Sequence, residues 1–505
     1  MALMIYNTIA RRKEKFVPRE EGKVGMYVCG PTVYNYIHVG NGRAYLVFDV
    51  IRRYLLYKGY QVLYVQNFTD VDDKIINRAR EEGKTPEEVA RFYEQAFRED
   101  MRALGVMPPD VAPRATETIP RMLEMIRGLV DKGFAYAVGG DVYFSVEKFP
   151  GYGKLSGRSL EEMRAGERVE VDERKRHPMD FALWKSSREG EPAWDSPWGK
   201  GRPGWHIECS AMSIQFLGMS FDIHGGGQDL IFPHHENEIA QAEAWAGKEP
   251  FVRYWVHNGF VNIREEKMSK SLGNIILVRE ILKKYQPDVV RLLALQTHYR
   301  SPIDFGPEAL EDARRAYERL ENCRFAMEDF LARPSQRAAP TRTQREVELS
   351  DSLFAFERRF EEAMDDDFNT ARALAVIFEL VKEFNAYLGE QERFPTPAAP
   401  IIVSLGRDLL LKLCRVLGLF LPEGEGEAFE EGLPEKREIG REGMPSPERL
   451  VELLLEVRAM ARDRKQYETA DFIRSRLREM GVRVDDLREG QRWKFVGTSG
   501  EEPPA

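Results

Sequence analysis

Apolar and polar positions alternate along the first part of the chain in the order strand, helix, strand. Residues 23–29 form a short apolar run that ends in a Gly/Pro turn, and residues 44–58 repeat apolar side chains at helical spacing until Gly59. A second apolar run follows at residues 61–67. This order predicts a βαβ unit and hence a parallel sheet, because parallel neighbours need a crossover connection between them.

The pattern changes twice more before the middle of the chain. After helical spacing over residues 85–104 and 116–133, short strand patterns among Gly, Pro and polar residues mark residues 136–202 as an insertion. Sheet-like apolar runs resume at residues 221–224 and 254–263. We therefore expect one parallel α/β domain that the insertion divides into two halves.

The second half of the chain follows a different plan. Helical spacing dominates residues 278–418, which predicts a set of packed helices with Pro-rich breaks between them. Glutamate, glycine and proline fill residues 421–446, a composition with too little apolar surface to fold alone, so we expect a solvated linker. Residues 447–496 show helical patterns and then short extended pieces, which predicts a small α+β module.

Bulk composition limits which cellular compartment and which class of binding partner we expect. No apolar run in the 505 residues is long enough to span a bilayer, and the first residues lack the pattern of a secretory signal. We therefore expect a cytoplasmic protein without a membrane partner. The net charge of −9 argues against non-specific coating of nucleic acid, so a polyanion partner would need a local basic face.

Cysteine usage leaves room for a metal site. Four cysteines in so long a chain cannot form a disulfide framework, so each is a core residue, a metal ligand or a nucleophile. Cys29 ends the first predicted strand, Cys209 lies in a helical pattern, and His234 and Glu238 stand four apart on one helix face. The spacing alone leaves core cysteines and a helix surface pair open as alternatives. A metalloprotease H-E-x-x-H motif is excluded, because Ile239 stands where its second histidine would be.

Three common nucleotide-binding motifs are absent. Leu230 breaks the G-x-G-x-x-G pattern that Gly225 and Gly227 begin, Leu155 breaks a P-loop, and no kinase-type glycine loop is present. If ATP binds, other loops must hold its phosphates.

The first candidate phosphate loop lies where a predicted strand gives way to a helix. His38 and Asn41 fall in the first turn, where free N–H groups and the helix dipole attract phosphate. Small Gly40 and Gly42 would let a nucleotide approach the backbone closely. The residues alone leave a glycine-rich helix cap open as the alternative.

The second candidate phosphate loop is a basic segment after a strand, for which a solvated charged turn is the alternative. Residues 267–271 read KMSKS, and residues 38–41 read HVGN. In this order the two segments resemble the KMSKS and HIGH motifs of class I aminoacyl-tRNA synthetases. The last histidine of the second motif is Asn41 here, which keeps a neutral donor without the positive charge.

Three further segments, residues 26–32, 204–210 and 232–238, resemble the zinc-binding segments of cysteinyl-tRNA synthetases. Matched position by position, the resemblance implies one Zn²⁺ with these ligands: Cys29, Cys209, His234 and Glu238. Zinc binds a thiolate far better than a hydroxyl, so such a site would select cysteine over serine without an editing step.

The resemblance also implies how ATP is used. The loops would clamp the triphosphate, with Mg²⁺, while the carboxylate of cysteine attacks the α-phosphorus, and catalysis would rest on positioning and charge stabilisation. Lys270 is expected to be the most important cation, assisted by Lys267, His38 and Asn41, which also bind ATP. Asp229 is expected to accept hydrogen bonds from the ribose hydroxyls.

Other matched positions concern cysteine and tRNA. Thr69 and Trp205 match residues that line the cysteine pocket of the family, and residues 362–370 match a motif of its helical bundle. Residues 458–495 hold eleven Lys and Arg against seven Asp and Glu, a local basic patch suited to tRNA. The positions matched to anticodon reading, with Tyr467 where some members have tryptophan, are Arg462, Tyr467, Asp471 and Asp486.

We expect an α/β fold: a Rossmann-type parallel-sheet catalytic domain with an inserted connective subdomain, followed by an α-helical bundle and a small C-terminal α+β module. The expected parts, in chain order, are the first catalytic half at residues 1–135, the connective insertion at 136–202, the second catalytic half with the zinc site and KMSKS loop at 203–275, stem-contact helices at 276–335, the tRNA-binding bundle at 346–420, the linker at 421–446 and the anticodon module at 447–496.

These features together indicate a bacterial-type member of the cysteinyl-tRNA synthetase family. Its partners would be tRNA(Cys), L-cysteine and ATP, and we expect a monomer. One alternative is the paralogous ligase of mycothiol synthesis, which passes cysteine to an amino sugar and lacks the terminal module. Another is a non-catalytic tRNA-binding paralogue, which would be expected to lose Lys270 or a zinc ligand. A second, persulfide-forming activity with pyridoxal phosphate is not favoured, because residues 74–77 lack the motif's final lysine.

Overall fold

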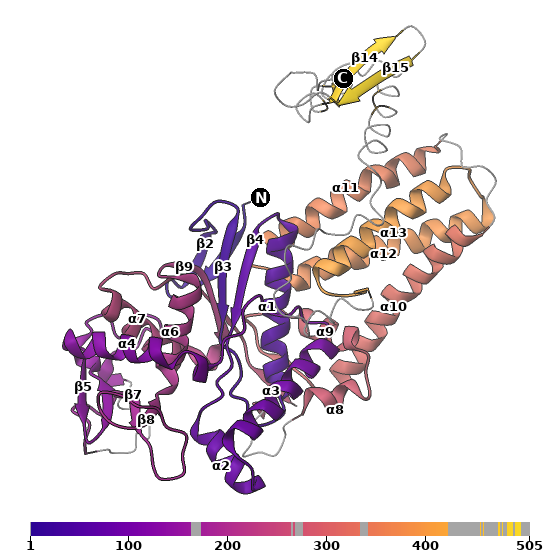
Figure 1. Cartoon of the computed structure of the whole chain (residues 1–505). Coiled ribbons are helices and arrows are strands. Elements are labelled where there is room, and N and C mark those ends of the chain that lie inside the picture. The colour runs from indigo at the N-terminus through magenta and orange to yellow at the C-terminus, as the bar shows by residue number, and fades with distance from the viewer. Residues whose placement is uncertain are drawn as a thin grey trace, which may run out of the picture. The chain divides into compact units, whose positions relative to one another are not determined.

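The computed structural model describes residues 2–162, 173–263, 266–267, 276–333 and 342–422, and near the C-terminus positions 455, 458, 473, 474, 477, 482–487 and 490–495 (Figure 1). The chain divides into two compact units, Met1–Glu430 and Glu431–Ala505. Among the described residues, no helix is both long enough and apolar enough to cross a membrane.

A parallel sheet of four strands lies at the centre of the first unit, in the order β10-β9-β3-β4. Its strands are β3 (Lys23–Val28), β4 (Gln61–Gln66), β9 (Phe221–Gly227) and β10 (Val252–Asn258). Alternate side chains of β3 enter different cores, because successive residues of a strand point to opposite faces. Met26 belongs to the core beneath α1 (Val39–Tyr57), and Tyr27 to the core beneath α6 (Trp205–Leu217), so the two helices cover opposite faces (Figure 1). The expected Rossmann-type parallel sheet is confirmed.

Helix α1 begins five residues earlier than the periodicity predicted. His38 is its N-cap, and His38 and Asn41 form a reciprocal capping box, so the HVGN segment is itself the first turn. The predicted end is confirmed, because Gly59 has a φ of +87° that suits glycine better than any other residue.

The insertion contains an antiparallel sheet in the order β5-β6-β7-β8. Its strands are β5 (Ala135–Val138), β6 (Asp141–Phe144), β7 (Phe181–Ser186) and β8 (Gly201–Pro203), and the helices before it are α2 (Asp73–Glu82), α3 (Pro86–Ala103) and α4 (Ile119–Asp131). Helix α2 was not predicted. Its buried residues, Ile75, Ile76 and Ala79, do follow helical spacing, but the helix is only ten residues long and its other positions are mostly charged.

The apolar run at residues 254–263 is two strands rather than one. After β10 the chain turns at Gly259, where an added Cβ would lie 2.5 Å from the carbonyl oxygen of Ser301. The second strand, β11 (Val261–Ile263), leaves the central sheet and pairs with β12 (Glu266–Lys267) and β13 (Ile303–Asp304). The contact of Gly259 with a segment forty residues away breaks the strand, and the apolar pattern does not reveal it.

A short wide turn, Ile231–His235, precedes α7 (Glu236–Ala246). The predicted helix was to start at His234. The regular helix starts two residues later, at Glu236, because residues 231–235 form the wide turn, in which Phe232, the residue before Pro233, is extended, with φ −138° and ψ 131°.

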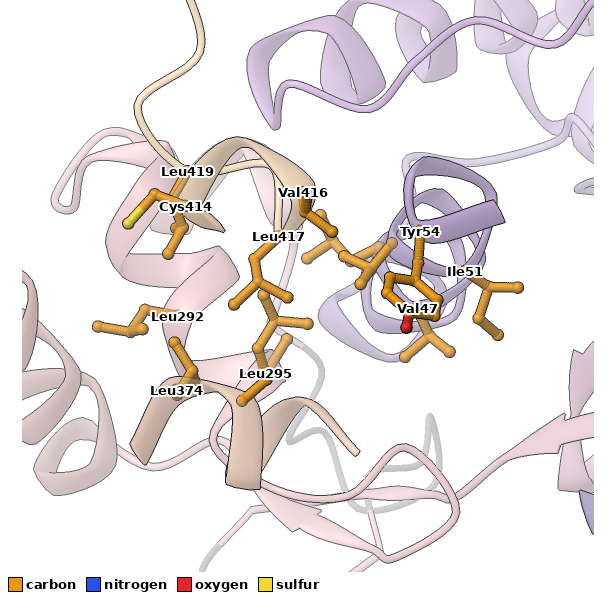
Figure 2. Close-up of a cluster of buried hydrophobic side chains, with 14 of the residues drawn as sticks. Val47, Ile51, Tyr54, Leu292, Leu295, Leu374, Cys414, Val416, Leu417 and Leu419 are labelled. Carbon is orange, nitrogen blue, oxygen red and sulfur yellow. The ribbon is translucent and has the colours of Figure 1, made fainter. Parts of the chain in front are cut away.

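The rest of the first unit is helical, with the small hairpin β1 (Met4–Asn7) and β2 (Arg12–Lys15) at its start. The helices are α8 (Val278–Leu282), α9 (Pro287–Leu295), α10 (Pro307–Ala332), α11 (Gln344–Asp365), α12 (Thr370–Arg393) and α13 (Ala399–Val416). Figure 2 shows how the bundle joins the sheet domain: Val47, Ile51 and Tyr54 of α1 share one buried cluster with Leu292 and Leu295 of α9 and Leu417 after α13.

In the second unit, an antiparallel hairpin joins β14 (Val482–Leu487) and β15 (Gly490–Phe495). Val482 and Val484 of β14 are buried in a small core with Leu455 and Leu477. The extended pieces predicted for this module are therefore present.

Candidate active site and metal centre

A cavity of about 430 Å³ opens where β3, β9 and β10 end. The strands are parallel, so their carboxyl ends meet at one edge of the sheet, where α/β proteins commonly bind ligands. One group of lining residues, which includes Cys29 and Trp205, adjoins the thiol cluster described below. Another group surrounds the start of α1 and includes these residues: His38, Gly40, Asn41, Gly227, Asp229, Asn258 and Gly259.

The four predicted metal ligands lie together and are all buried. Cys29 follows β3, Cys209 lies in α6, His234 precedes α7, and Glu238 lies in the first turn of α7. The Cys29 and Cys209 sulfurs are 3.7 Å apart, Cys29 Sγ lies 3.6 Å from Glu238 Oε1, and His234 Nε2 lies 3.0 Å from the same oxygen. One ligand atom from each residue lies within 4.8 Å of the others, which is compatible with a single bound metal ion.

The charges of this cluster are arranged for a cation. Burial would raise the pKa of Glu238, but His224 and His234 hold it at about 2. The hydrogen bond from the Cys29 thiol lowers the pKa of Cys209 to about 6, whereas burial raises the pKa of Cys29 itself. Burial would lower the pKa of His234, but Glu238 and Cys209 raise it to about 10. The acidic pKa values of Glu238 and Cys209 favour the carboxylate and thiolate forms, which are the forms that bind a metal ion.

A second group of possible ligands overlaps the first and was not predicted from the sequence. His224 and His235 join Cys29 and Glu238 in a set whose ligand atoms also lie within 4.8 Å of one another. His224 Nε2 is 2.9 Å from Glu238 Oε2, and His235 Nε2 is 3.3 Å from Cys29 Sγ. Behind them, His235 Nδ1 lies 2.8 Å from Nε2 of His257, whose pKa burial lowers to about 3. These imidazoles hydrogen-bond to the ligands or to one another and so fix the positions of the ligands. In the sequence, the one indication of their role is that they are polar residues in or beside apolar segments.

Trp205 and Thr69, predicted to line a cysteine pocket, lie near the cluster in different ways. Trp205 lines the cavity and stacks on the His234 ring with centroids 4.3 Å apart. Thr69 is buried and does not line the cavity, and its hydroxyl donates to Glu208 Oε2 at 2.8 Å. The roles of both residues stay predictions.

At the start of α1, the capping box fixes the orientation of two predicted phosphate-binding side chains. His38 Nδ1 accepts from the Asn41 backbone N–H at 3.2 Å, and Asn41 Oδ1 accepts from the His38 N–H at 3.3 Å. A ring nitrogen that accepts carries no proton, so the proton of neutral His38 lies on Nε2, which can donate. Gly40 lines the cavity as expected, but Gly42 does not: an added Cβ there would lie 2.9 Å from a methyl group of Val278.

The glycine run at the end of β9 serves close packing. A Cβ on Gly225 would lie 2.3 Å from the Phe48 ring of α1, and one on Gly226 would lie 2.8 Å from the ring of His235. The run therefore lets α1 and the histidine cluster approach both faces of the strand. Asp229 follows it and lies exposed at the cavity.

Comparison with known proteins agrees with this geometry. Residues 15–315, more than half of the chain, match the family of class I (C) tRNA synthetase catalytic domains, and residues 359–421 match the DALR domain. A cysteine–tRNA ligase of Desulfitobacterium hafniense is 53% identical over 495 residues, which cover 98% of this chain and 99% of that protein. The corresponding protein of Pelotomaculum thermopropionicum is 53% identical over 494 residues, 98% of this chain and 100% of that protein.

The chain belongs to the cysteine–tRNA ligase family. It is therefore an enzyme of the class I aminoacyl-tRNA synthetases. Solved structures of more distant proteins share the fold. A Mycobacterium tuberculosis methionyl-tRNA synthetase in complex with methionyl-adenylate has a TM-score of 0.63 at 16% identity, covering 80% of this chain and 92% of that one. A putative arginyl-tRNA synthetase of Campylobacter jejuni has a TM-score of 0.53 at 12% identity, with 80% and 94% covered.

The two lysines that the family resemblance singles out are described unequally. Lys267 lies in β12, whose backbone pairs with Asn262 of β11, and the neighbouring Val261 lines the cavity. Lys270 lies outside the described residues. The expected roles of these lysines as cations of the ligase reaction stay predictions.

The anticodon positions expected from the cysteine–tRNA ligase family fall in the second unit. Asp486 lies in β14, with Gln491 of β15 as its backbone partner. Arg462, Tyr467 and Asp471 lie outside the described residues, so their proposed contacts with tRNA rest on the sequence.

Proposed function

We propose that this chain activates L-cysteine with ATP to cysteinyl-adenylate and then transfers the cysteinyl group to the 3′-terminal adenosine of tRNA(Cys). One observation supports this most strongly: Cys29 belongs to the metal-ligand cluster and also lines the cavity whose wall includes the start of α1. A ligand that reaches the cluster with its sulfur can therefore place its other groups beside the proposed phosphate loop.

The metal in this proposal is Zn²⁺. A tetrahedral zinc site with bonds of about 2.0 to 2.3 Å has ligand separations of roughly 3.3 to 3.8 Å. Three of the six separations here are 3.0, 3.6 and 3.7 Å, and all six are within 4.8 Å. Two thiols, one imidazole and one carboxylate are a donor set that zinc accepts. Cys29, Cys209, His234 and Glu238 would hold the zinc, which would supply a Lewis acid for the substrate's thiolate and leave the hydroxyl of serine without a comparable contact.

The side chains around the rest of the cavity would position ATP, bound with Mg²⁺. The backbone N–H groups of Val39, Asn41 and Gly42 already have hydrogen-bond partners, so the side-chain donors of His38 and Asn41 and the dipole of α1 would act on the proposed phosphates. Asp229 would accept from the ribose hydroxyls. Lys267 and Lys270 would neutralise charge as the cysteine carboxylate attacks the α-phosphorus and pyrophosphate leaves. No protein nucleophile is required, because both steps use a nucleophile of a substrate.

Pyrophosphate exchange with cysteine and serine side by side, together with a zinc measurement on the purified protein, tests this proposal. We expect exchange that depends on cysteine, with about one zinc per chain, and serine exchange at least about a hundredfold weaker. Equal exchange with serine, or full exchange in protein free of zinc, would contradict the role given to the cluster.

The acceptor of the second step separates this proposal from its nearest rival. The ligase of mycothiol synthesis would transfer cysteine to glucosaminyl-inositol, whereas the relatives named cysteine–tRNA ligase match this chain over nearly its full length. We propose tRNA as the acceptor, bound by the DALR region and by the module at residues 447–496. We also propose that the protein is a cytoplasmic monomer whose domains have the seven sets of bounds expected from the sequence. Charging assays with the two acceptors decide this, and transfer to the sugar alone would overturn it.

A further inference from the structure

The corner between α11 and α12 carries three consecutive aspartates whose side chains contact different parts of the molecule. Asp365 accepts a hydrogen bond at 2.7 Å from the Tyr54 hydroxyl of α1. Asp366 pairs at the surface with Lys13 at 2.5 Å and with Arg372 at 3.0 Å. The third, Asp367, has no exposed side-chain surface and lies in the part of the chain matched to the DALR domain.

Asp367 satisfies three donors at once. Its Oδ1 accepts from the backbone N–H of Tyr6 and from the hydroxyl of Tyr299, both at 2.8 Å, and its Oδ2 accepts from Nε of Arg300 at 2.8 Å. The backbone of Asp367 is left-handed, with φ +64°, a conformation that Asp and Asn tolerate better than other side chains. The helical bundle thus holds the segment around Tyr299 and Arg300 through one buried carboxylate.

That segment forms the back of the cavity wall. The Tyr299 carbonyl accepts from the Gly259 N–H at 2.8 Å, and the Arg300 carbonyl accepts from Nε2 of Gln228 at 3.3 Å. Gly259 lines the cavity, and Gln228 directly precedes Asp229, the proposed ribose acceptor.

A buried arginine of α1 connects the residues that line the cavity with the segment behind them. Arg43 lies two residues after Asn41 and donates to four carbonyl oxygens, those of Gly259, Phe260, Tyr299 and Ser301, at 2.6 to 3.3 Å. The start of α1, the turn after β10 and the segment that Asp367 holds are therefore one hydrogen-bonded assembly around the proposed nucleotide.

We propose that Asp367, although it lies in the helical bundle, is a positioning residue for ATP, which it acts on through Arg300 and the wall of the cavity. This inference rests on the proposed function, because it assigns the surrounding part of the cavity to the nucleotide. Among the described residues, neither Asp367 nor the Arg300 side chain contacts a proposed metal ligand, so we expect cysteine binding and metal content to stay unchanged when the Arg300 contact is lost.

Asp367→Asn in the full-length chain tests the proposal. The amide keeps an oxygen for Tyr6 and Tyr299 and tolerates the left-handed backbone, but it turns an N–H₂ donor toward the Arg300 guanidinium. We expect the KM for ATP in cysteine-dependent pyrophosphate exchange to rise about tenfold, with the KM for cysteine and the zinc content unchanged. Asp366→Asn, the same change one residue earlier in a surface pair, is the matched control and should leave both KM values unchanged.

Arg300→Met and the double variant provide the second measurement. If Asp367 acts through Arg300, Arg300→Met raises the ATP KM by a similar factor. The ATP KM of the double variant is then no higher than that of either single variant. Should Asp367→Asn fail to fold, the ATP KM of Arg300→Met alone tests the inference. The inference is overturned by any of three results. The first is an unchanged ATP KM in a folded variant, the second an equal rise in the KM values for cysteine and ATP, and the third the same rise in ATP KM in Asp366→Asn. A wild-type chain without cysteine-dependent exchange overturns the proposed function and this inference with it.

Discussion

Single cysteines in this chain have different chemical surroundings, so the same substitution has different expected results. Cys209 lies in the metal cluster, whereas Cys323 is a core residue of α10 whose sulfur lies 3.9 Å from the Val381 carbonyl oxygen. We expect Cys209→Ser to lose the metal and cysteine-dependent pyrophosphate exchange, because a hydroxyl is a poor zinc ligand. Cys323→Ser should keep both, as metal analysis and the exchange assay can show. Unchanged metal content and exchange in Cys209→Ser would remove that residue from the site.

His38 has two separable tasks, to cap α1 and to donate a hydrogen bond from Nε2. Asparagine is a good N-cap but cannot reproduce the imidazole donor, so His38→Asn keeps the first task and loses the second. We expect the exchange rate to fall by about 10² to 10³, while the thermal midpoint of unfolding changes little. His38→Ala should lose activity to a similar extent and also destabilise the protein. Near-normal exchange in His38→Asn would show that only the cap matters.

At the residue scale, the spacing along the chain predicted the His234–Glu238 pair but could not join it to Cys29 and Cys209. Those ligands are distant in sequence, and only the resemblance to a family connected them before the structure brought them together. His224, His235 and His257 were missed, because a histidine in an apolar run has no periodicity that separates a buried hydrogen-bond partner from core packing.

Among the elements, α1 and α9 depend on one buried ion pair. Asp49 Oδ2 accepts from Arg291 at 2.5 Å and from Arg53 at 2.9 Å, and Oδ1 accepts from the Met107 N–H at 2.9 Å. Burial would raise the pKa of Asp49, but the two arginines lower it below its usual 3.8. Because the folded pKa is the lower one, the stabilisation is complete above the unfolded value and is lost as pH falls through the folded value.

Asp49→Asn should therefore destabilise the protein by roughly 3 to 5 kcal/mol at neutral pH, since it leaves a buried guanidinium without its charge partner. Below about pH 4 the difference in unfolding free energy between wild type and variant should shrink, because Asp49 of the unfolded wild-type chain then takes up a proton while folded Asp49, with its lower pKa, is still ionised. Denaturant unfolding at several pH values measures this. Asp329→Asn, which alters an exposed pair with Arg333, should change stability by less than about 1 kcal/mol. A pH-independent difference would contradict the assignment to this pair.

Elements with regular apolar spacing were predicted well, and those set by distant contacts were not. The parallel strands and the long helices of the second half followed their periodicity. The break between β10 and β11 arises because carbonyl groups of residues 300 and 301 lie against Gly259, a contact in space that hydrophobic periodicity does not record. Helix α2 was missed for another reason: its three buried residues follow helical spacing, but the helix is only ten residues long.

For the whole molecule, the division into two compact units leads us to expect that cysteine activation and tRNA charging can be separated. A chain that ends at Glu430 keeps the cavity, the cluster and the helical bundle. We expect it to retain cysteine-dependent pyrophosphate exchange within about twofold, whereas its kcat/KM for tRNA charging should fall by about a hundredfold or more, because a linked binding module is lost. Exchange by the same preparation is the internal control. Charging at the wild-type rate would show that the second unit is not needed for tRNA.

The cluster of Cys29, Cys209, His234 and Glu238 also has a consequence for the order of assembly. Its sulfurs are separated by 180 residues of chain, and Cys29 is separated from Glu238 by 209. In a zinc finger the ligands are neighbours in sequence, so the metal can start folding. Here the two halves of the sheet must close across the whole insertion before four ligands meet. If the cluster binds zinc as proposed, metal uptake would follow closure of the sheet, and the metal content of a preparation would report the fraction of chains that have reached the final topology.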